Sequence, residues 1–498
     1  MSGFNLQLNL MDLIDSHATR LGDKPVIRHK KKKLSYSELP ASIEAIKGGI
    51  DYLNNSRVMI ILPDGIGTTL LYLHLFLSKA TVIPISTQAT TLHIEKISGK
   101  IKPHFLVTNR ILYKKHEKLL ARFNCVVVDM PGDKIPQFKL IPAWNSNGAQ
   151  RPEVAREIST DNDIRVVLFT SGSTGEPKGV CLSDYNLLAA ASMMADFLDL
   201  GPDRHTLITL PSFDYYGFIQ IFGHLMRGGE CILGESAAFM GSLLKVIEEG
   251  QCTDLAIVPH SLRQIINVME NKSKRSLNEL SVVTSSSDLL TEELVTRSFA
   301  LNPDLTFFDI YGLTEAGRAC YKKIRIDTPF SRSIGRPSNG VEISVDNPDD
   351  EAGEIVIKGP NVAKGYFSDI IDDRIDICAI DCVRTGDIGC LDDAGNIILI
   401  GRKDHMINLM GEKIHPSEIE SLAMMVAGIE DAIAHPKEHA DGRRFIRLDV
   451  VCADFDAEKE SEILALVRNS LGRTFVPEEV VTVPMIERTE LGSKAKRF

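Results

Sequence analysis

The sequence predicts an α/β protein, with a large N-terminal α/β domain of several sheets followed by a small C-terminal α+β domain. Three observations lead to this prediction. The chain has 498 residues, more than one hydrophobic core usually accommodates. Its composition, 44% hydrophobic and 25% charged, is that of an ordinary globular protein. Short apolar runs alternate with segments of helical spacing, which is typical of strands joined by crossover helices.

The first part of the chain shows this alternation. Compact apolar runs predict strands at 25–27, 58–62, 81–85, 106–108 and 125–128. Helical spacing of apolar residues predicts helices near 4–20, through Ile43, Ile46 and Ile50, and at 68–78. The region 131–157 is polar and proline-rich, and we expect a long connection there.

A phosphate-binding loop is predicted directly after the next strand, 164–169. Glycines let backbone N–H groups approach an anion, hydroxyls add donors, and a lysine adds a point charge. The spacing of the glycines and the lysine differs from the Walker pattern. Considered without the rest of the chain, this stretch could also be a flexible Ser/Gly surface turn. The candidate residues are Thr170, Ser171, Gly172, Ser173, Thr174, Gly175 and Lys178.

A helix at 184–197 and strands at 207–211, 256–259 and 281–284 precede a second candidate stretch. Here Tyr311, Thr314 and Glu315 can supply a stacking surface, a phosphate donor and an Mg²⁺ ligand, although a strand ending in a plain turn is the alternative. Asp387 lies in a Thr-Gly-Asp turn, where a carboxylate can accept from both hydroxyls of a ribose. A purely structural turn is the alternative there.

The last hundred residues predict the small domain. Helices beginning at 416 and 460 flank strands near 446–451 and 480–483. This is a compact α+β arrangement of ordinary domain size.

Charge and cysteine content exclude several classes of protein. Lys and Arg number 56 against 67 Asp and Glu, a net charge of −11, so nucleic-acid binding is not expected. The basic run 30–33 is best explained as a solvated hairpin turn. Nine scattered cysteines predict buried free thiols in a reducing compartment, and the cluster Cys378, Cys382 and Cys390 lacks a nearby histidine for zinc. The first twenty residues lack a secretory signal, and no apolar run spans a bilayer, so we expect a soluble, cytoplasmic protein.

Four stretches, in order along the chain, resemble the acyl-adenylate-forming (AMP-binding) superfamily of acyl-CoA synthetases, peptide-synthetase adenylation domains and firefly-type luciferases. They are the phosphate loop, 311–315, 385–389, and 401–408 with 416–420. Gly353–Glu354–Ile355 is a weaker parallel. The resemblance covers nearly the whole chain. It implies an adenylation domain over 1–400, a linker 401–403 leading to a hinge at Asp404, and a mobile C-terminal domain over 404–498.

The resemblance also implies roles for single residues. Tyr311 would stack on adenine, Thr314 would contact the α-phosphate and Glu315 would bind Mg²⁺. Asp387 and Arg402 would hold the ribose, Ser286 would lie beside the nucleotide, and the phosphate loop would hold the β- and γ-phosphates. ATP and Mg²⁺ are the implied cofactors.

The expected C-terminal catalytic lysine departs from the pattern. The family reads approximately R-T-x-x-G-K, whereas this chain has Ser493 in place of the lysine and Lys494 one position later. We favour Lys494, because a loop beside Gly492 can absorb one residue. The alternatives are Lys496, weakened adenylation, or a solvated basic tail.

Asp214, Tyr215 and Ser285 are the candidate contacts for the acid. Asp214 falls where adenylation domains place an aspartate that pairs with a substrate amino group, and backbone donors or Tyr215 and Tyr216 are the alternative partners. Hydroxyls at 285–287, where relatives have small residues, mildly favour a small or polar acid.

The resemblance therefore implies ATP-dependent activation of a carboxylic acid to an acyl-adenylate, followed by transfer to a thiol. Coenzyme A or the phosphopantetheine arm of a separate carrier protein would supply that thiol. The alternatives are a stand-alone amino-acid adenylating enzyme that loads a carrier protein, and a non-catalytic nucleotide-binding relative. Nothing in the sequence favours a luciferase-like oxygenase.

Overall fold

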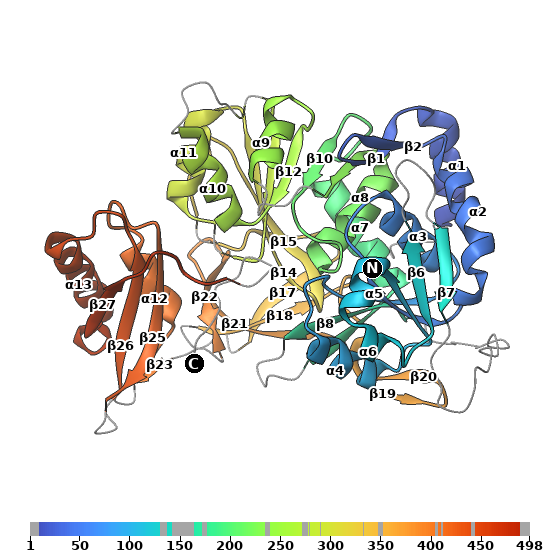
Figure 1. Cartoon of the computed structure of the whole chain (residues 1–498). Coiled ribbons are helices and arrows are strands. Elements are labelled where there is room, and N and C mark those ends of the chain that lie inside the picture. Colours follow the sequence, from blue (N-terminus) through green and yellow to red (C-terminus); the bar gives the residue numbers. More distant parts are fainter. Residues whose placement is uncertain are drawn as a thin grey trace.

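A computed structural model of the chain describes residues 9–129, 137–141, 164–171, 177–234, 240–270, 277, 279–288, 290–331, 333–346, 352–403, 407–409, 412–439 and 444–488. Within these residues the strands form two nine-stranded sheets, a four-stranded sheet, and a two-stranded and a three-stranded sheet near the C-terminus. Figure 1 shows the two large sheets with their helices, and the C-terminal lobe beside them.

The first large sheet, here the β8 sheet, has the order β20-β19-β9-β8-β4-β3-β5-β6-β7. Its central strands are parallel, and β9 and β7 run antiparallel to their neighbours. The bounds are β3 (Arg57–Ile61), β4 (Thr81–Pro84), β5 (Phe105–Asn109), β6 (Cys125–Asp129), β7 (Gln137–Ile141), β8 (Ile164–Ser171), β9 (Pro177–Ser183), β19 (Gly365–Ile371) and β20 (Arg374–Ala379).

The second large sheet, here the β14 sheet, has the order β16-β15-β14-β13-β12-β10-β11-β1-β2. Its strands β1 and β2 form an antiparallel hairpin, as predicted, and the basic run covers the turn at Lys30 and Lys31 and the first two residues of β2. The bounds are β1 (Pro25–His29), β2 (Lys32–Ser35), β10 (His205–Ile208), β11 (Glu230–Leu233), β12 (Asp254–Ile257), β13 (Val282–Ser285), β14 (Thr306–Leu313), β15 (Ala316–Ile324) and β16 (Arg336–Pro337).

Helices fill the space between the two large sheets and cover their outer faces. Side chains alternate on β3: Val58 and Ile60 join the core shared with α3, α7 and α8, whereas Met59 and Ile61 join the core with α4 to α6. α7 contacts both β9 and β15 and so bridges the sheets. The helices are α1 (Leu10–Leu21), α2 (Leu39–Ile50), α3 (Ile66–Leu77), α4 (Thr91–Ile101), α5 (Arg110–Lys115), α6 (Glu117–Leu120), α7 (Asp184–Phe197), α8 (Tyr215–Arg227), α9 (Met240–Glu248), α10 (Pro259–Glu270) and α11 (Glu292–Leu301).

The four-stranded sheet is antiparallel and joins the large domain to the C-terminal lobe. Its strands are β17 (Glu342–Asp346), β18 (Gly353–Lys358), β21 (Val383–Leu391) and β22 (Ile397–Arg402). The lobe contains β23 (Ile407–Leu409), β24 (Glu412–Ile414), α12 (Pro416–Ala423), β25 (Asp431–Glu438), β26 (Arg444–Val451), α13 (Ala457–Leu471) and β27 (Glu479–Thr482). It has its own apolar core, built around Ile419, Leu448 and Ile463.

The structure adds detail to the sequence-based prediction. The α/β architecture is confirmed, as is the helix at 184–197. The expected connection 131–157 contains an edge strand, β7, in its described part. Asp387 was expected in a turn, but it lies inside strand β21, where Gly386 adopts a left-handed φ of 72°. No described helix combines the length and apolar character needed to cross a bilayer.

Candidate active site

The strands on either side of the predicted phosphate loop form an antiparallel pair in which Thr170 lies opposite Lys178. Gly179 follows that lysine in a tightly packed position, where a Cβ would lie 3.0 Å from the Cβ of Phe367. The loop itself, 172–176, lies outside the described residues. The predicted contacts of Ser171, Gly172, Ser173, Thr174 and Gly175 therefore stay predictions.

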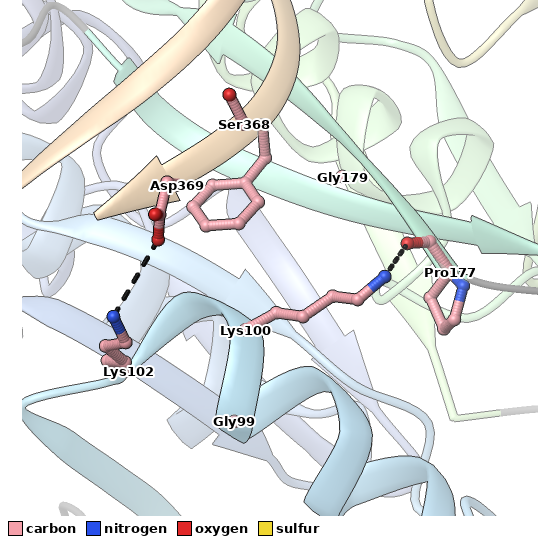
Figure 2. A pocket seen from close by; sticks show the side chains of 8 residues that line it. Gly99, Lys100, Lys102, Pro177, Gly179, Ser368 and Asp369 are labelled. Carbon is pink, nitrogen blue, oxygen red and sulfur yellow. Dashed lines mark hydrogen bonds and ion pairs between the residues drawn. The ribbon is translucent and has the colours of Figure 1, made fainter. Parts of the chain in front are cut away.

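A cavity of about 280 Å³ adjoins the strand that leaves this loop (Figure 2). At its wall, Lys100 Nζ donates to the Pro177 carbonyl oxygen at 3.3 Å. Lys102 Nζ lies 3.7 Å from Asp369 Oδ1. The C-terminal end of α4 is thus tied both to the start of β9 and to β19.

Tyr366 connects the phosphate-loop lysine to the second motif. Lys178 Nζ lies 5.7 Å from the centre of the Tyr366 ring, and the Tyr366 hydroxyl donates to Glu315 Oε1 at 3.1 Å. Burial and the Glu315 carboxylate raise the pKa of Tyr366, which stays protonated as a donor. No local sequence pattern predicts this residue, because its position depends on the pairing of Tyr366 with Val180 of β9.

Thr314 and Glu315 form the two-residue connection between β14 and β15. The pairing of these strands is irregular just before it, between Tyr311 and Leu313. Gly312 makes this irregularity possible, since a Cβ there would lie 2.8 Å from the backbone nitrogen of Arg318. The glycine of the motif is therefore a geometric requirement, and it directs the turn toward the phosphate-loop strands.

Asp387 brings the second, third and fourth motifs together. The Tyr311 hydroxyl donates to Asp387 Oδ2 at 2.7 Å, and Arg402 Nη1 lies 3.4 Å from Asp387 Oδ1. Arg402 also donates to the Thr385 carbonyl oxygen at 3.2 Å. Burial, followed by the Asp387 carboxylate, raises the pKa of Tyr311 well above its usual range. Tyr311 is half-buried, and its hydroxyl is fixed while part of its surface remains accessible.

Glu354 supports this cluster from β18. Its Oε1 accepts the Gly386 N–H at 3.0 Å, and its Oε2 lies 3.3 Å from Lys403 Nζ and 3.6 Å from Arg384 Nη1. The carboxylate thus holds the left-handed glycine that precedes Asp387. The sequence marks Glu354 only as a weak parallel, because its role depends on the pairing of β18 with β21.

Asp214 and Tyr215 lie at the N-terminus of α8. Asp214 caps the helix by accepting the Tyr216 N–H at 2.9 Å, so a backbone donor satisfies part of this carboxylate. Burial raises the pKa of Asp214, whereas the Tyr216 N–H and the charge of Arg318 oppose that rise. The Tyr216 hydroxyl lies 2.7 Å from the hydroxyl of Thr284 on β13.

Ser285 and Ser286, which follow Thr284 of β13, lie in different environments. Ser286 donates to the Ile310 carbonyl oxygen at 2.8 Å, directly beside Tyr311 on β14. Ser285 follows Thr284 and therefore points to the opposite face of the sheet, where its buried hydroxyl has no partner within the described part of the chain. The structure thus places Ser286 next to the nucleotide-site candidates, and among the described residues Ser285 and Asp214 form no hydrogen bond with each other.

Arg488 connects the C-terminal lobe to the large domain. Its Nη1 lies 2.7 Å from Asp288 Oδ2, just beyond β13, and its Nη2 contacts Asp431 at the start of β25. Lys494, its alternative Lys496 and the hinge candidate Asp404 lie outside the described residues. The described chain therefore ends next to the segment that carries Ser286.

Comparisons with known proteins fit this geometry. The family model of the AMP-binding enzymes matches residues 14–367. The 4-coumarate–CoA ligase 2 of Oryza sativa subsp. japonica is 29% identical over 357 residues, which cover 67% of this chain but only 62% of that enzyme. The D-alanine–D-alanyl carrier protein ligase of Listeria monocytogenes serotype 4a (strain HCC23) is 25% identical over 506 residues, covering 97% of this chain and 96% of that ligase.

A solved structure has the same fold. The ATP-bound MatB of Rhodopseudomonas palustris superposes with a TM-score of 0.77 over 97% of both chains, at 21% identity. The family model alone spans well over half of the 498 residues, and its span includes the phosphate loop, Tyr311 and Glu315. This chain therefore belongs to the AMP-binding enzyme family.

Proposed function

We propose that this enzyme is an AMP-forming acid–thiol ligase. It activates a small carboxylic acid with ATP, releases pyrophosphate, and transfers the acyl group from the acyl-adenylate to a thiol. The observation that carries the proposal is the convergence of four motifs through two chains of contacts, Lys178–Tyr366–Glu315 and Tyr311–Asp387–Arg402.

The second chain of contacts suits the nucleoside. The bond to Asp387 holds the Tyr311 ring in one orientation, which is what a stacking surface for adenine needs. A carboxylate accepts hydrogen bonds only, so Asp387 is suited to ribose hydroxyls, with Arg402 beside it to hold its orientation. Ser286 would border the same site from β13.

The first chain of contacts suits the phosphates. The described residues contain no group of three His, Cys, Asp or Glu side chains that could hold a metal alone. Mg²⁺ commonly uses one or two carboxylates together with substrate phosphates, so a single, partly accessible Glu315 fits it. Bound there, Mg²⁺ would offset the charge of the triphosphate. Thr314 would donate to the α-phosphate, and Thr170, Lys178 and the phosphate loop would hold the departing pyrophosphate.

The catalytic lysine is proposed from the C-terminal tail. Arg488 is anchored to Asp288, and Lys494 follows it by six residues. An extended chain spans at most about 3.3–3.6 Å per residue, so Lys494 can act up to about 20 Å from this anchor. That reach supports a role for Lys494 in bridging the acid and the α-phosphate.

Thiol transfer is proposed to follow a rotation of the C-terminal domain, residues 404–498, about Asp404. The named relatives include a CoA ligase and a carrier protein ligase, so coenzyme A and a carrier-bound phosphopantetheine are both candidate acceptors. All nine cysteines are free thiols, which supports a reducing compartment such as the cytoplasm.

ATP–pyrophosphate exchange with a panel of fatty, aryl, dicarboxylic and amino acids tests the proposal. We expect exchange with one class of acid, a large loss in Lys494→Ala, and little change in the matched variant Lys496→Ala. A loss confined to Lys496→Ala would move the catalytic role to that lysine. Absence of exchange with every acid, despite measurable ATP binding, would contradict the proposed function.

A further inference from the structure

Arg318 on β15 is a buried cation that the proposed reaction does not yet use. The residue is only 3% exposed, and it is the third residue of β15, three positions after Glu315 of the preceding turn. Its guanidinium carbon lies 4.1 Å from the centre of the Tyr216 ring, and its Nη2 donates to the Tyr216 carbonyl oxygen at 3.3 Å. Its Nε is buried and has no hydrogen-bond partner within the described residues.

The surroundings of Arg318 leave its charge poorly compensated. Among the described residues, no carboxylate forms an ion pair with it within 4.0 Å. Asp214 influences it only at longer range, and that carboxylate already caps α8. The N-terminus of α8 itself carries a partial positive charge. Because an uncompensated buried cation is unfavourable, the site is suited to an additional anion.

Tyr215 supplies a second unsatisfied polar group beside Arg318. Its hydroxyl is buried and has no partner within the described part of the chain. Its ring packs against Gly317, where a Cβ would lie 1.8 Å from Tyr215 Cε1, so any larger residue at that position would displace the ring. Asn361 holds the Gly317 carbonyl oxygen at 2.9 Å, which fixes this segment of β15.

Arg318 and Tyr215 lie close to the place where the acid substrate is proposed to react. Arg318 lies on the strand that begins directly after the Thr314–Glu315 turn, and Tyr215 begins the helix capped by Asp214. Because Tyr215 packs on Gly317, an acid whose reacting end lies at Thr314 would approach α8 if its acyl part followed the first residues of β15. The groups it would meet there are Arg318 and the Tyr215 hydroxyl.

We propose that Arg318 determines specificity by binding a second carboxylate on the acyl part of the substrate, with the Tyr215 hydroxyl as an additional donor. This inference rests on the proposed adenylation function and assigns its substrate class as a dicarboxylic acid. It also disfavours an amino-acid substrate, because an ammonium group on Asp214 would lie beside the positive charges of Arg318 and the α8 N-terminus.

Matched acids that differ only at the far end test the inference. Pentanedioate, pentanoate and 5-aminopentanoate carry a carboxylate, a methyl group and an ammonium group, and the same trio is used with shorter and longer chains. In ATP–pyrophosphate exchange, kcat/KM for the best dicarboxylate should exceed that of its methyl counterpart by about tenfold to a hundredfold. Arg318→Met should remove this preference, and Arg318→Lys should retain part of it.

A binding measurement separates this inference from the proposed function. The best dicarboxylate should raise the melting temperature of the wild type but not of Arg318→Met, whether or not exchange occurs. Arg318→Met should itself be close to the wild type in stability, because removal of a buried charge offsets the loss of the bond to the Tyr216 carbonyl oxygen and of the contact with its ring.

Two results would overturn the inference. One is a wild-type preference for the methyl or ammonium acids at every chain length. The other is equal stabilisation by dicarboxylates in the wild type and Arg318→Met. Exchange with another class of acid would then leave adenylation intact. Dicarboxylate binding without any exchange would contradict adenylation and leave only the assignment of Arg318 as a carboxylate-binding residue.

Discussion

Tyr366 offers a sharp test of the contact between the phosphate-loop strands and the predicted metal ligand. Tyr366→Phe removes only the hydroxyl that donates to Glu315 Oε1 at 3.1 Å, and it keeps the ring over which Lys178 lies. A hydrogen bond to a charged group contributes about 1.5–3 kcal/mol. Since Tyr366 is half-buried, we take the lower end, about 1.5 kcal/mol, which corresponds to roughly a tenfold loss of adenylation rate. Tyr366→Leu removes the ring as well and should cost about 0.5–1 kcal/mol more.

The assay is ATP–pyrophosphate exchange as a function of Mg²⁺ concentration. Because the lost bond orients Glu315, we expect Tyr366→Phe to need more Mg²⁺ for its half-maximal rate. Tyr52→Phe is the matched control, since the buried Tyr52 hydroxyl has no partner among the described residues and its ring packs on Phe105, away from the motifs. Wild-type rates in Tyr366→Phe at every Mg²⁺ concentration would refute the reasoning.

Three further predictions concern the nucleoside contacts, a buried histidine and the link between the domains. Tyr311→Phe removes the bond to Asp387 and should raise the KM for ATP about tenfold with little change in kcat, as steady-state kinetics would show. Burial lowers the pKa of His224 to about 4, below the usual 6.5, so the unfolded chain takes up the proton first as the pH falls. Stability should therefore decrease by about 3 kcal/mol between pH 6.5 and 4, and urea unfolding should show a flatter pH dependence in His224→Gln. Arg488→Gln breaks the bridge to Asp288 and should lower exchange several-fold and speed tryptic cleavage between the domains.

These three predictions have their own controls and contrary outcomes. An unchanged KM in Tyr311→Phe would contradict the nucleoside assignment, and equal pH slopes for wild type and His224→Gln would contradict the histidine argument. Lys24→Gln removes an exposed ion pair with Asp203 and controls for a general loss of charge, since exposed pairs contribute little. If Arg488→Gln resembles Lys24→Gln, the bridge does not set the domain arrangement.

Much of the fold follows from local patterns in the sequence. The helix α7 begins where predicted because Ser183 and Asn186 form a reciprocal cap, with each backbone N–H bonded to the other side chain at 3.2 Å. The strand β7 could not be predicted in the same way. It is a short edge strand in which Phe138 and Leu140 alternate with Gln137 and Lys139, and it is held by its pairing with β6 inside a stretch that is polar as a whole.

Some residues of the candidate site are also predictable from local patterns, whereas others are not. Thr314, Glu315 and Asp387 are found from short motifs, because the chemistry requires those residue types at fixed spacing. Short motifs do not identify Tyr366 or Arg318. The position of Tyr366 depends on the pairing of β9 with β19, and that of Arg318 depends on the packing of β15 against α8. Asp387 was placed in a turn because a Thr-Gly-Asp sequence is common there, whereas in the folded chain the glycine accommodates an irregular strand.

The measurement that tests the central claim most directly is calorimetric binding of ATP, with and without Mg²⁺, to the wild type, Asp387→Asn and Glu315→Gln. If the two chains of contacts form one nucleotide site, Asp387→Asn should weaken ATP binding about tenfold in both conditions. Glu315→Gln should weaken it only when Mg²⁺ is present. Wild-type affinity in both variants, or an effect of Glu315→Gln that does not depend on Mg²⁺, would contradict the proposed site.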